Sequence, residues 1–220
     1  MNYELARHNM IEQQLRPWKV GNPAVIDQLY ADRREDFVPT AYRALAFADV
    51  EIPIGHGASL LPPKLEGRIL QALAMQPHEC VLEIGAGSGH MAALLAARAK
   101  EVWTVEIDPA IAALARANLA RQGIDNVHVE VGDGLAGLAA SVASNAPFDV
   151  IVVSGGVNEI PANLIDQLNV GGRLMAFVGT APTMSLRLLT RVSADAVSSE
   201  DLLETVVPML KQSPVKHFVF

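Results

Sequence analysis

Apolar and polar positions alternate at helical spacing over much of the first third of the chain. In residues 22–30, "NPAVIDQLY", Asn22 stands at a helix cap and Pro23 at the first helical position, and apolar side chains then recur on one face. The more polar stretch at 10–16, "MIEQQLR", is also helix-like. These segments predict an N-terminal helical extension, which is followed at 54–63 by "IGHGASLLPP", a stretch with no regular apolar period.

The pattern changes after Pro63, which opens a further helix, because from residue 80 the apolar residues gather into short β-branched runs. The strand-like runs lie at 80–84, 102–107, 127–131, 148–154 and 173–179, and helix-like segments lie between them at 90–99, 109–123, 134–141 and 160–168. Strands that alternate with helices and are apolar along their length are typical of a parallel sheet covered on both faces. Candidates for further strands at one edge are the runs at 185–193, 202–207 and 216–220.

The composition of the chain argues against several classes of protein. It has 220 residues, of which 50% are hydrophobic and 19% charged, enough to bury a full core. No apolar run approaches the roughly 20 residues that span a bilayer, and the first ten residues lack the apolar centre of a signal peptide. Cys80 is the only cysteine, as is typical of a reducing compartment. We therefore expect a cytoplasmic protein with no membrane contact.

Charge and histidine spacing narrow the classes of ligand. A formal net charge of −7 argues against a nucleic-acid partner, because binding to a phosphate backbone depends on clustered Lys and Arg. The six histidines show no paired metal-ligand spacing, so no metal is expected. Nothing in these patterns indicates an oligomeric state.

The glycines of "VLEIGAGSGH", residues 81–90, carry the most specific signal. Gly85, Gly87 and Gly89 follow an apolar strand and precede a helix, where glycine lets the backbone adopt positive φ and approach a ligand closely. One glycine would suit a tight connection without a ligand, whereas three at alternate positions favour a nucleotide-like ligand. The dinucleotide fingerprint needs glycine where this chain has His90, and the Gly-Lys-Ser/Thr of a phosphate loop is absent. The stretch resembles motif I of class I S-adenosylmethionine-dependent methyltransferases.

Acidic residues end the next two strands. Glu106 stands where a carboxylate can accept hydrogen bonds from both ribose hydroxyls, and Asp133, in "GDG", resembles the methyltransferase acid that accepts from the adenine amino group. Ligands bind at the carboxyl ends of strands in open α/β sheets, and carboxylates suit a cofactor that is cationic and has no phosphate. An unpaired carboxylate inside the first strand would cost several kcal/mol, so we assign Glu83 to the ligand's ammonium group or to a backbone donor.

An ordered set of motifs resembles one family within that class. In order, the motifs are "MIEQQLR", "FVPTAY", "FADVEIPIGHG", "VLEIGAGSGHMAALLA", "NVHVEVGDGLAG", "PFDVIVVSGG" and "IPANLIDQLNVGGRL". From about residue 10 to about residue 180 they resemble, in order and spacing, the protein-L-isoaspartate O-methyltransferases. The resemblance implies S-adenosyl-L-methionine as cofactor and a protein or peptide carboxylate, the L-isoaspartyl residue, as methyl acceptor. It also implies a strand order reversed at one edge relative to most methyltransferases.

The stretch at 54–63 departs from the family's pattern. The family reads "IGxGQTISQP" there, a loop that covers the cofactor and holds the isoaspartyl carboxylate with its threonine and serine hydroxyls. This chain has Ala58 for the first glutamine, Ser59 for the threonine and Leu61 for the serine. One hydroxyl is retained and one is lost, so we interpret the stretch as a substrate loop with altered acceptor-binding chemistry. Ser59 and His56 are its candidate catalytic residues.

The sequence therefore predicts a single domain, residues 1–220, in which 1–63 form the helical extension and the substrate loop. Residues 64–220 form the cofactor-binding core, a doubly wound, mostly parallel seven-stranded α/β sheet. The expected cofactor-binding residues are Glu83, Gly85, Gly87, Ser88, Gly89, His90, Glu106, Ile107, Asp133 and Gly134. For His90, contact with the cofactor carboxylate and plain helix packing are both open.

Methyl transfer from S-adenosyl-L-methionine to a carboxylate, most simply that of an L-isoaspartyl residue, is the leading hypothesis. The alternative is a cofactor-binding homologue with a different acceptor or no transferase activity. Leu61, which replaces the family's serine, is the reason for considering it. A nicotinamide oxidoreductase ranks third, because His90 occupies the last position of the dinucleotide fingerprint.

Overall fold

The N-terminal part of the chain forms a group of short helices. The computed structural model describes residues 2–212, and within them α1 (Tyr3–Met10) continues into a π-helical turn, η1 (Ile11–Leu15). The remaining helical elements of this part are α2 (Pro23–Ala31) and two 3₁₀ turns, η2 (Arg34–Asp36) and η3 (Thr40–Leu45). α2 begins as predicted, because the Asn22 side chain accepts a hydrogen bond from the N–H of Ala24 at 3.0 Å and proline follows the cap.

The stretch without an apolar period forms a small antiparallel hairpin. Its strands are β1 (Ile52–Gly55) and β2 (Ala58–Leu60), and its turn contains His56 and Gly57 at φ of 51° and 71°. The left-handed region suits glycine and is uncommon for other residues, so His56 is held there by its surroundings. Helix α3 (Pro63–Leu73) follows and begins at the predicted proline.

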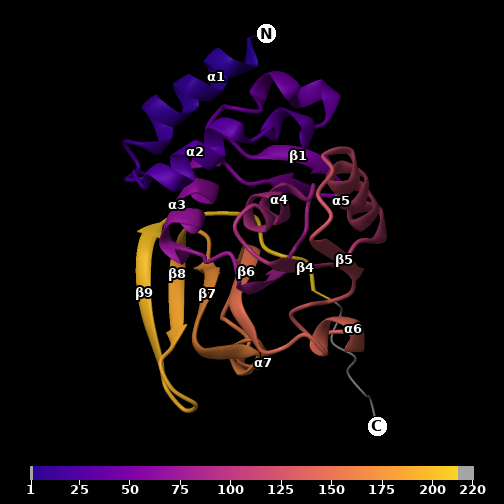
Figure 1. Cartoon of the computed structure of the whole chain (residues 1–220), viewed down its shortest axis with the longest axis vertical. Helices are drawn as coiled ribbons and strands as arrows, with labels where there is room; N and C mark the ends of the chain where they lie inside the picture. The colour runs from indigo at the N-terminus through magenta and orange to yellow at the C-terminus, as the bar shows by residue number, and fades with distance from the viewer. Residues whose placement is uncertain (1, 213–220) are drawn as a thin grey trace.

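A seven-stranded sheet forms the centre of the molecule (Figure 1). Its strands are β3 (Cys80–Ile84), β4 (Glu101–Glu106), β5 (Val127–Val131), β6 (Phe148–Val157), β7 (Leu168–Thr180), β8 (Thr183–Arg191) and β9 (Val197–Glu204). They are arranged in the order β5-β4-β3-β6-β7-β8-β9. The first five in this order are parallel, whereas β8 is antiparallel to β7 and β9 is antiparallel to β8. The predicted fold class is confirmed, and the strand considered at 216–220 lies outside the described residues.

Helices connect the parallel strands, but one predicted helix is mostly absent. The connecting helices are α4 (His90–Ala96), α5 (Pro109–Arg121), α6 (Ala140–Ala143) and α7 (Ala162–Asp166). The helix predicted over 134–141 is wrong except at its end, where α6 begins. The Asp133 side chain accepts hydrogen bonds from the N–H groups of Leu135 and Ala136, at 3.1 and 3.2 Å, and so stabilises a turn at that place.

The N-terminal extension packs against one face of the sheet. Successive residues of a strand point to opposite faces, and Val150 and Ile151 of β6 accordingly belong to two different apolar clusters. The cluster that contains Val150 also contains Leu15 and Ile26 from the extension. The two parts therefore share one core, and the division of the chain at residue 63 stays a prediction.

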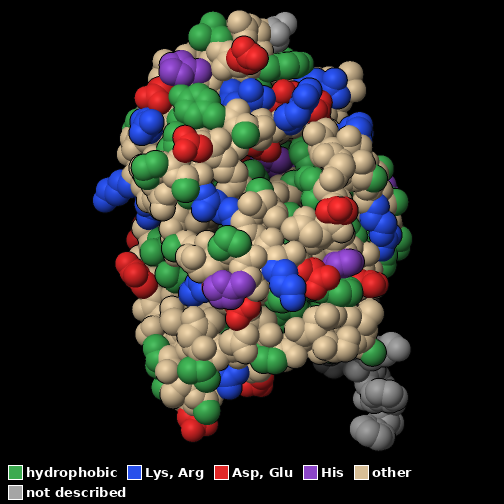
Figure 2. All heavy atoms as spheres, viewed as in Figure 1, with side chains coloured by type: hydrophobic (Ala, Val, Ile, Leu, Met, Phe, Trp, Pro, Cys, Tyr) green, Lys and Arg blue, Asp and Glu red, His purple; other side chains and the backbone are tan. Residues whose placement is uncertain are grey.

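The surface on the face shown in Figure 2 carries acidic and basic side chains side by side, without one dominant patch of either sign. Within residues 2–212 no helix is both long enough and apolar enough to cross a membrane.

Candidate active site

A pocket opens at the carboxyl ends of the central parallel strands. Its walls come from the hairpin and Leu61, the ends of β3, β4 and β6, the turns after β3, β4 and β5, the start of α5, and the segment 208–211. The lining residues are Gly57, Ala58, Ser59, Leu61, Ile84, Gly85, Gly87, Val105, Glu106, Ile107, Asp108, Ile111, Gly132, Asp133, Gly134, Leu135, Ser154, Gly155, Pro208, Met209, Leu210 and Lys211. This is the edge at which ligands bind in open α/β sheets.

The glycines of the first turn bring the backbone to the pocket wall. Gly85 and Gly87 line the pocket at φ of 94° and 53°, which side chains with a Cβ rarely adopt. A Cβ on Gly85 would lie 2.9 Å from a methyl carbon of Leu210, and one on Gly134 would lie 2.5 Å from a methyl carbon of Ile84. Only glycine therefore fits at either position without displacing Leu210 or Ile84.

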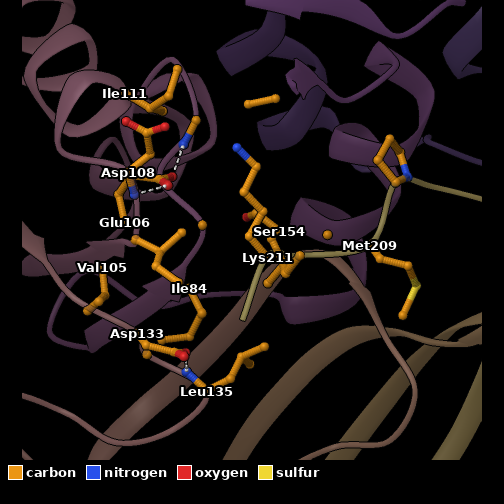
Figure 3. A pocket seen from close by; sticks show the side chains of 18 of the residues that line it. Ile84, Val105, Glu106, Asp108, Ile111, Asp133, Leu135, Ser154, Met209 and Lys211 are labelled. Carbon is orange, nitrogen blue, oxygen red and sulfur yellow. Dashed lines mark hydrogen bonds between the residues drawn. The ribbon is translucent and has the colours of Figure 1, made fainter. Parts of the chain in front are cut away.

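Glu106 and Asp133 stand on the same wall of the pocket (Figure 3). One Glu106 oxygen accepts from the N–H of Gly87 at 3.2 Å and the other accepts from the N–H of Asp108 at 3.0 Å. These bonds fix the carboxylate and leave further lone pairs on its oxygens for a ligand. Ile107 and Gly134, also predicted from the sequence, line the pocket beside them.

Glu83 lies behind the wall, fully buried. Its carboxyl oxygens lie 2.7 Å from the hydroxyls of Thr104 and Ser154, so its partners are side chains and not the backbone donor considered from the sequence. Burial raises the pKa of Glu83 to about 8, although both hydroxyl contacts act to lower it. Because Ser154 lines the pocket, Glu83 acts on the site through the orientation of that hydroxyl.

Like Glu83, the predicted cofactor ligands Ser88, Gly89 and His90 are not among the pocket-lining residues. Ser88 is buried, and its carbonyl accepts a hydrogen bond from the side chain of Asn118 at 2.8 Å. Gly89 is the cap of α4, and a Cβ there would lie 3.2 Å from the carbonyl oxygen of Ala115 on α5. These two residues pack helices together, which explains why the third glycine of the motif is needed without facing a ligand.

His90 belongs to a buried cluster of charges, and this placement favours the packing alternative. Its ring nitrogens lie 2.9 Å from carboxylate oxygens of Glu66 and Asp32, and Arg34 pairs with Glu66. Burial acts to lower the pKa of His90, but the two carboxylates raise it to about 9. The ring is therefore a cation at neutral pH, so two cations balance two carboxylates in what we call the Arg34 cluster (Asp32, Arg34, Glu66 and His90).

Comparison with known proteins decides the family. The family model described as Protein-L-isoaspartate(D-aspartate) O-methyltransferase matches residues 6–213. A protein-L-isoaspartate O-methyltransferase of Gloeobacter violaceus is 39% identical over 209 residues, which cover 94% of this chain and all of that protein. The chain belongs to the protein-L-isoaspartate O-methyltransferase family.

Further relatives extend the same likeness. The protein-L-isoaspartate O-methyltransferase 1 of Rhodopseudomonas palustris is 41% identical over 212 residues, covering 95% of this chain and 84% of that protein. A solved protein-L-isoaspartate O-methyltransferase superposes with a TM-score of 0.80 at 24% identity, covering 93% of this chain and 66% of that one. A Plasmodium falciparum structure in complex with S-adenosyl-L-homocysteine superposes with a TM-score of 0.81 at 18% identity, covering 97% and 100% of the two chains. The two structural likenesses show the shared fold.

The hairpin of this isoaspartate methyltransferase homologue forms the roof of the pocket. Ala58, Ser59 and Leu61, where the chain departs from the family's loop, all line the pocket. His56 is not a lining residue, and its ring instead lies 3.0 Å from a carboxylate oxygen of Asp108. Of the two candidate catalytic residues, the structure thus brings Ser59 to the pocket and leaves His56 as a contact between the hairpin and α5.

The segment 208–211 is the part of the site that the sequence did not indicate. Residues 208–211 run beside the end of β6, where the N–H of Gly156 donates to the carbonyl of Pro208 at 2.8 Å and that of Leu210 donates to the carbonyl of Gly156 at 2.9 Å. A Cβ on Gly155 would lie 2.6 Å from Leu210. The glycine pair at the end of a parallel strand was the available signal, since glycine in a strand marks close approach of another backbone.

Proposed function

We propose that the chain transfers the methyl group of S-adenosyl-L-methionine to the side-chain carboxylate of L-isoaspartyl residues in damaged proteins. The observation that carries the proposal is the pocket at the carboxyl ends of β3, β4 and β5, in a chain of this family, with Glu106 and Asp133 on one wall. The same proposal assigns Gly85, Gly87 and Gly134 to close backbone contact with the cofactor.

The residues of the pocket fit this cofactor chemically. S-adenosyl-L-methionine is a cation without phosphates, and Glu106, Asp108 and Asp133 give the pocket three carboxylates. Gly85 and Gly134 hold the backbone of two turns at the pocket wall, where a Cβ would collide with Leu210 or Ile84. We propose that Glu106 accepts from the ribose hydroxyls and Asp133 from the adenine amino group.

The chain's own contribution to the reaction is positioning. When bound, the cofactor would supply an electrophilic methyl group, which would leave its sulfur and bond to the acceptor oxygen. An acceptor carboxylate is already ionised at neutral pH, so the protein needs no general base. Its task is to align that carboxylate with the methyl group and to exclude water. Holding the two groups in the reactive orientation raises their effective molarity and so increases the rate of methyl transfer. Ser59 supplies a hydroxyl donor on the hairpin side for this purpose.

Turnover of a defined substrate tests the proposal. We expect the protein to methylate a peptide that contains one L-isoaspartyl residue, measured as labelled methanol released by base, and not the same peptide with ordinary aspartate. Gly87→Asp is the inactive control, because it forces a side chain and a negative charge into a backbone position at φ 53°.

A cofactor-binding homologue without transferase activity, the alternative suggested by the sequence, would give a different result in this assay. A protein that binds S-adenosyl-L-homocysteine in calorimetry but releases no methanol above the Gly87→Asp background would be a cofactor-binding homologue without this transferase activity. The observation in its favour is Leu61, whose apolar side chain takes the place of a hydroxyl in the pocket wall.

We further propose that the protein acts in the cytoplasm on protein or peptide substrates and has no nucleic-acid partner. The single cysteine and the net charge of −7 support these expectations, as does the mixture of charges on the face shown in Figure 2.

A further inference from the structure

The charged side chains of the pocket are distributed unequally. Glu106, Asp108 and Asp133 supply three carboxylates along the turns after β4 and β5. Among the described lining residues, the one cationic side chain is Lys211, in the segment that follows Pro208. An anionic acceptor in this pocket therefore meets repulsion from the three carboxylates and, among the described lining residues, attraction from one cation, Lys211.

The hydroxyl groups of the pocket cannot take over the part of the Lys211 charge in binding an anionic acceptor. The Ser154 hydroxyl is engaged with Glu83 at 2.7 Å, which turns it toward the interior of the sheet. Leu61 presents a side chain without donors, and Ala58 is also apolar. On the hairpin side of the described pocket, Ser59 remains as the hydroxyl donor, and a carboxylate binds better to several donors or to a cation than to one hydroxyl.

Lys211 reaches the hairpin itself. Its ammonium group donates to the carbonyl of His56 and lies 4.0 Å from the position a Cβ of Gly57 would take. In Figure 3 the side chain extends into the pocket from the C-terminal segment, opposite the wall that carries Glu106 and Asp108. The cation thus lies beside the loop on which Ser59 stands.

We propose that Lys211 binds the carboxylate of the methyl acceptor, together with the Ser59 hydroxyl, and so supplies the interaction that Leu61 no longer makes. This inference rests on the proposed function, because it names the residue that recognises the acceptor at the same site. Lys211 is a specificity-determining residue: it selects an anionic side chain next to the methyl group and disfavours neutral amides of the same shape.

The cofactor's own carboxylate is the other anion that Lys211 meets in this pocket. The amino-acid end of the cofactor is expected at the turn of Gly85 and Gly87, whereas the ammonium contacts the hairpin turn at His56 and Gly57. The position beside the hairpin favours the acceptor. An experiment that measures the two ligands separately distinguishes them.

The test separates the effect of the positive charge of Lys211 from the effect of its hydrogen bond to the His56 carbonyl. Lys211→Gln keeps a donor for the His56 carbonyl but removes the charge, and Lys211→Arg keeps both. Lys100→Gln removes an exposed lysine that does not line the pocket and serves as the matched control. For each protein, fluorescence anisotropy gives the Kd of a labelled isoaspartyl peptide in the presence of S-adenosyl-L-homocysteine, and calorimetry gives the Kd of S-adenosyl-L-homocysteine itself.

We expect Lys211→Gln to weaken peptide binding about tenfold or more and Lys211→Arg to restore most of it, since a charge-assisted hydrogen bond is lost in the first variant only. Lys100→Gln should leave peptide binding unchanged, and S-adenosyl-L-homocysteine should bind equally well to all four proteins. Added salt should weaken peptide binding to the parent more than to Lys211→Gln.

The remaining outcomes separate this inference from the proposed function. Equal peptide affinity for Lys211→Gln and the parent overturns the role of Lys211, whether or not the peptide is methylated. A parallel loss of S-adenosyl-L-homocysteine affinity overturns it in favour of the cofactor carboxylate. Peptide binding that depends on Lys211 without methanol release supports the role of Lys211 and overturns the proposed transferase function. A parent protein that does not bind the peptide overturns both the role of Lys211 and the proposed function.

Discussion

Two side chains near the pocket, Glu83 and Leu61, illustrate how single residues set the properties of this site. Glu83 is a buried carboxyl group that two hydroxyls satisfy, and burial raises its pKa to about 8. Leu61 is an apolar residue whose side chain lines the pocket while its carbonyl accepts from Arg34 at 2.6 Å. We expect the first residue to make the stability of the protein depend on pH and the second to influence which acceptors bind.

Glu83→Gln should change how stability depends on pH. A folded-state pKa raised from 4.5 to about 8 means that the native protein binds this proton more tightly than the unfolded chain does. Its contribution is therefore complete below the unfolded pKa and is lost as the pH rises through about 8. Glutamine can bond both hydroxyls without titrating.

Urea unfolding of both proteins at several pH values measures this effect. Relative to Glu83→Gln, the parent should lose free energy of unfolding as the pH rises from about 5 to about 8. His90 titrates in both proteins, so its contribution cancels in the difference. Parallel pH profiles for the two proteins would contradict the assignment of a neutral carboxyl group.

Leu61→Ser should raise turnover of the isoaspartyl peptide. The substitution returns a hydroxyl to the pocket wall and leaves the backbone contact with Arg34 in place. One recovered hydrogen bond to a carboxylate is expected to raise kcat/KM about tenfold. Initial-rate methanol release checks this, with Leu61→Ala as the control for side-chain size. An unchanged or lower kcat/KM in Leu61→Ser would show that the hydroxyl has no acceptor to bind.

At the scale of secondary structure, the pocket depends on two elements that approach the central strands from opposite ends of the sequence. The hairpin of β1 and β2 contributes Ser59, and the segment 208–211 contributes Lys211. The second element lies against the end of β6 only because Gly155 and Gly156 have no side chains. The absence of side chains at Gly155 and Gly156 thus allows the segment 208–211 to form part of the pocket wall.

Gly155→Ala should weaken cofactor binding without unfolding the sheet. The added Cβ would lie 2.6 and 2.8 Å from two carbons of Leu210 and 3.3 Å from the carbonyl oxygen of Pro208, so the segment must move. We expect the Kd of S-adenosyl-L-homocysteine to rise about tenfold, with circular dichroism unchanged. Gly21→Ala is the matched control, because nothing lies within 4 Å of the added Cβ. Equal affinities in the two variants would show that the segment does not shape the site.

The order of elements could be predicted from the sequence, and so could much of one wall of the pocket. Almost continuous apolar runs predict the strands from neighbouring residues alone. The residues that end or follow these runs, such as Gly85, Glu106 and Asp133, predict one wall of the pocket. The length of β7 could not be read, because Gly171 and Gly172 look like a turn while pairing of Leu168 with Phe148 extends the ladder across them. Lys211 reaches the pocket through a contact between distant segments, which the glycine pair at 155–156 signals on β6 but which no pattern near Lys211 itself encodes.

At the scale of the whole molecule, the Arg34 cluster joins the N-terminal extension to the cofactor-binding core. Arg34 is buried and donates to the carbonyls of Ala46 and Leu61, both at 2.6 Å, besides pairing with Glu66. His90, at the start of α4, completes the connection to the glycine turn. The segment that follows the hairpin, at Leu61, and the helix that follows the glycine turn, at His90, therefore contact one set of buried charges.

Arg34→Met should destabilise the whole protein. Removing one partner leaves the buried carboxylates incompletely paired, which typically costs about 3–5 kcal/mol in free energy of unfolding. Arg33→Met is the matched control, since the neighbouring side chain is 67% exposed and pairs only with Asp36 at the surface. Its effect should stay within about 0.5 kcal/mol. Denaturant unfolding measures both, and a loss in Arg34→Met no larger than the control's would show that the cluster adds nothing to stability.

The placement of 208–211 in the pocket wall separates the integrity of the sheet from the integrity of the site. All seven strands of the central sheet end by Glu204, so a protease that cuts between Glu204 and Pro208 leaves every strand in the polypeptide and detaches one wall of the pocket. Such a cut would give a sheet of full length with a site that no longer encloses the methyl donor.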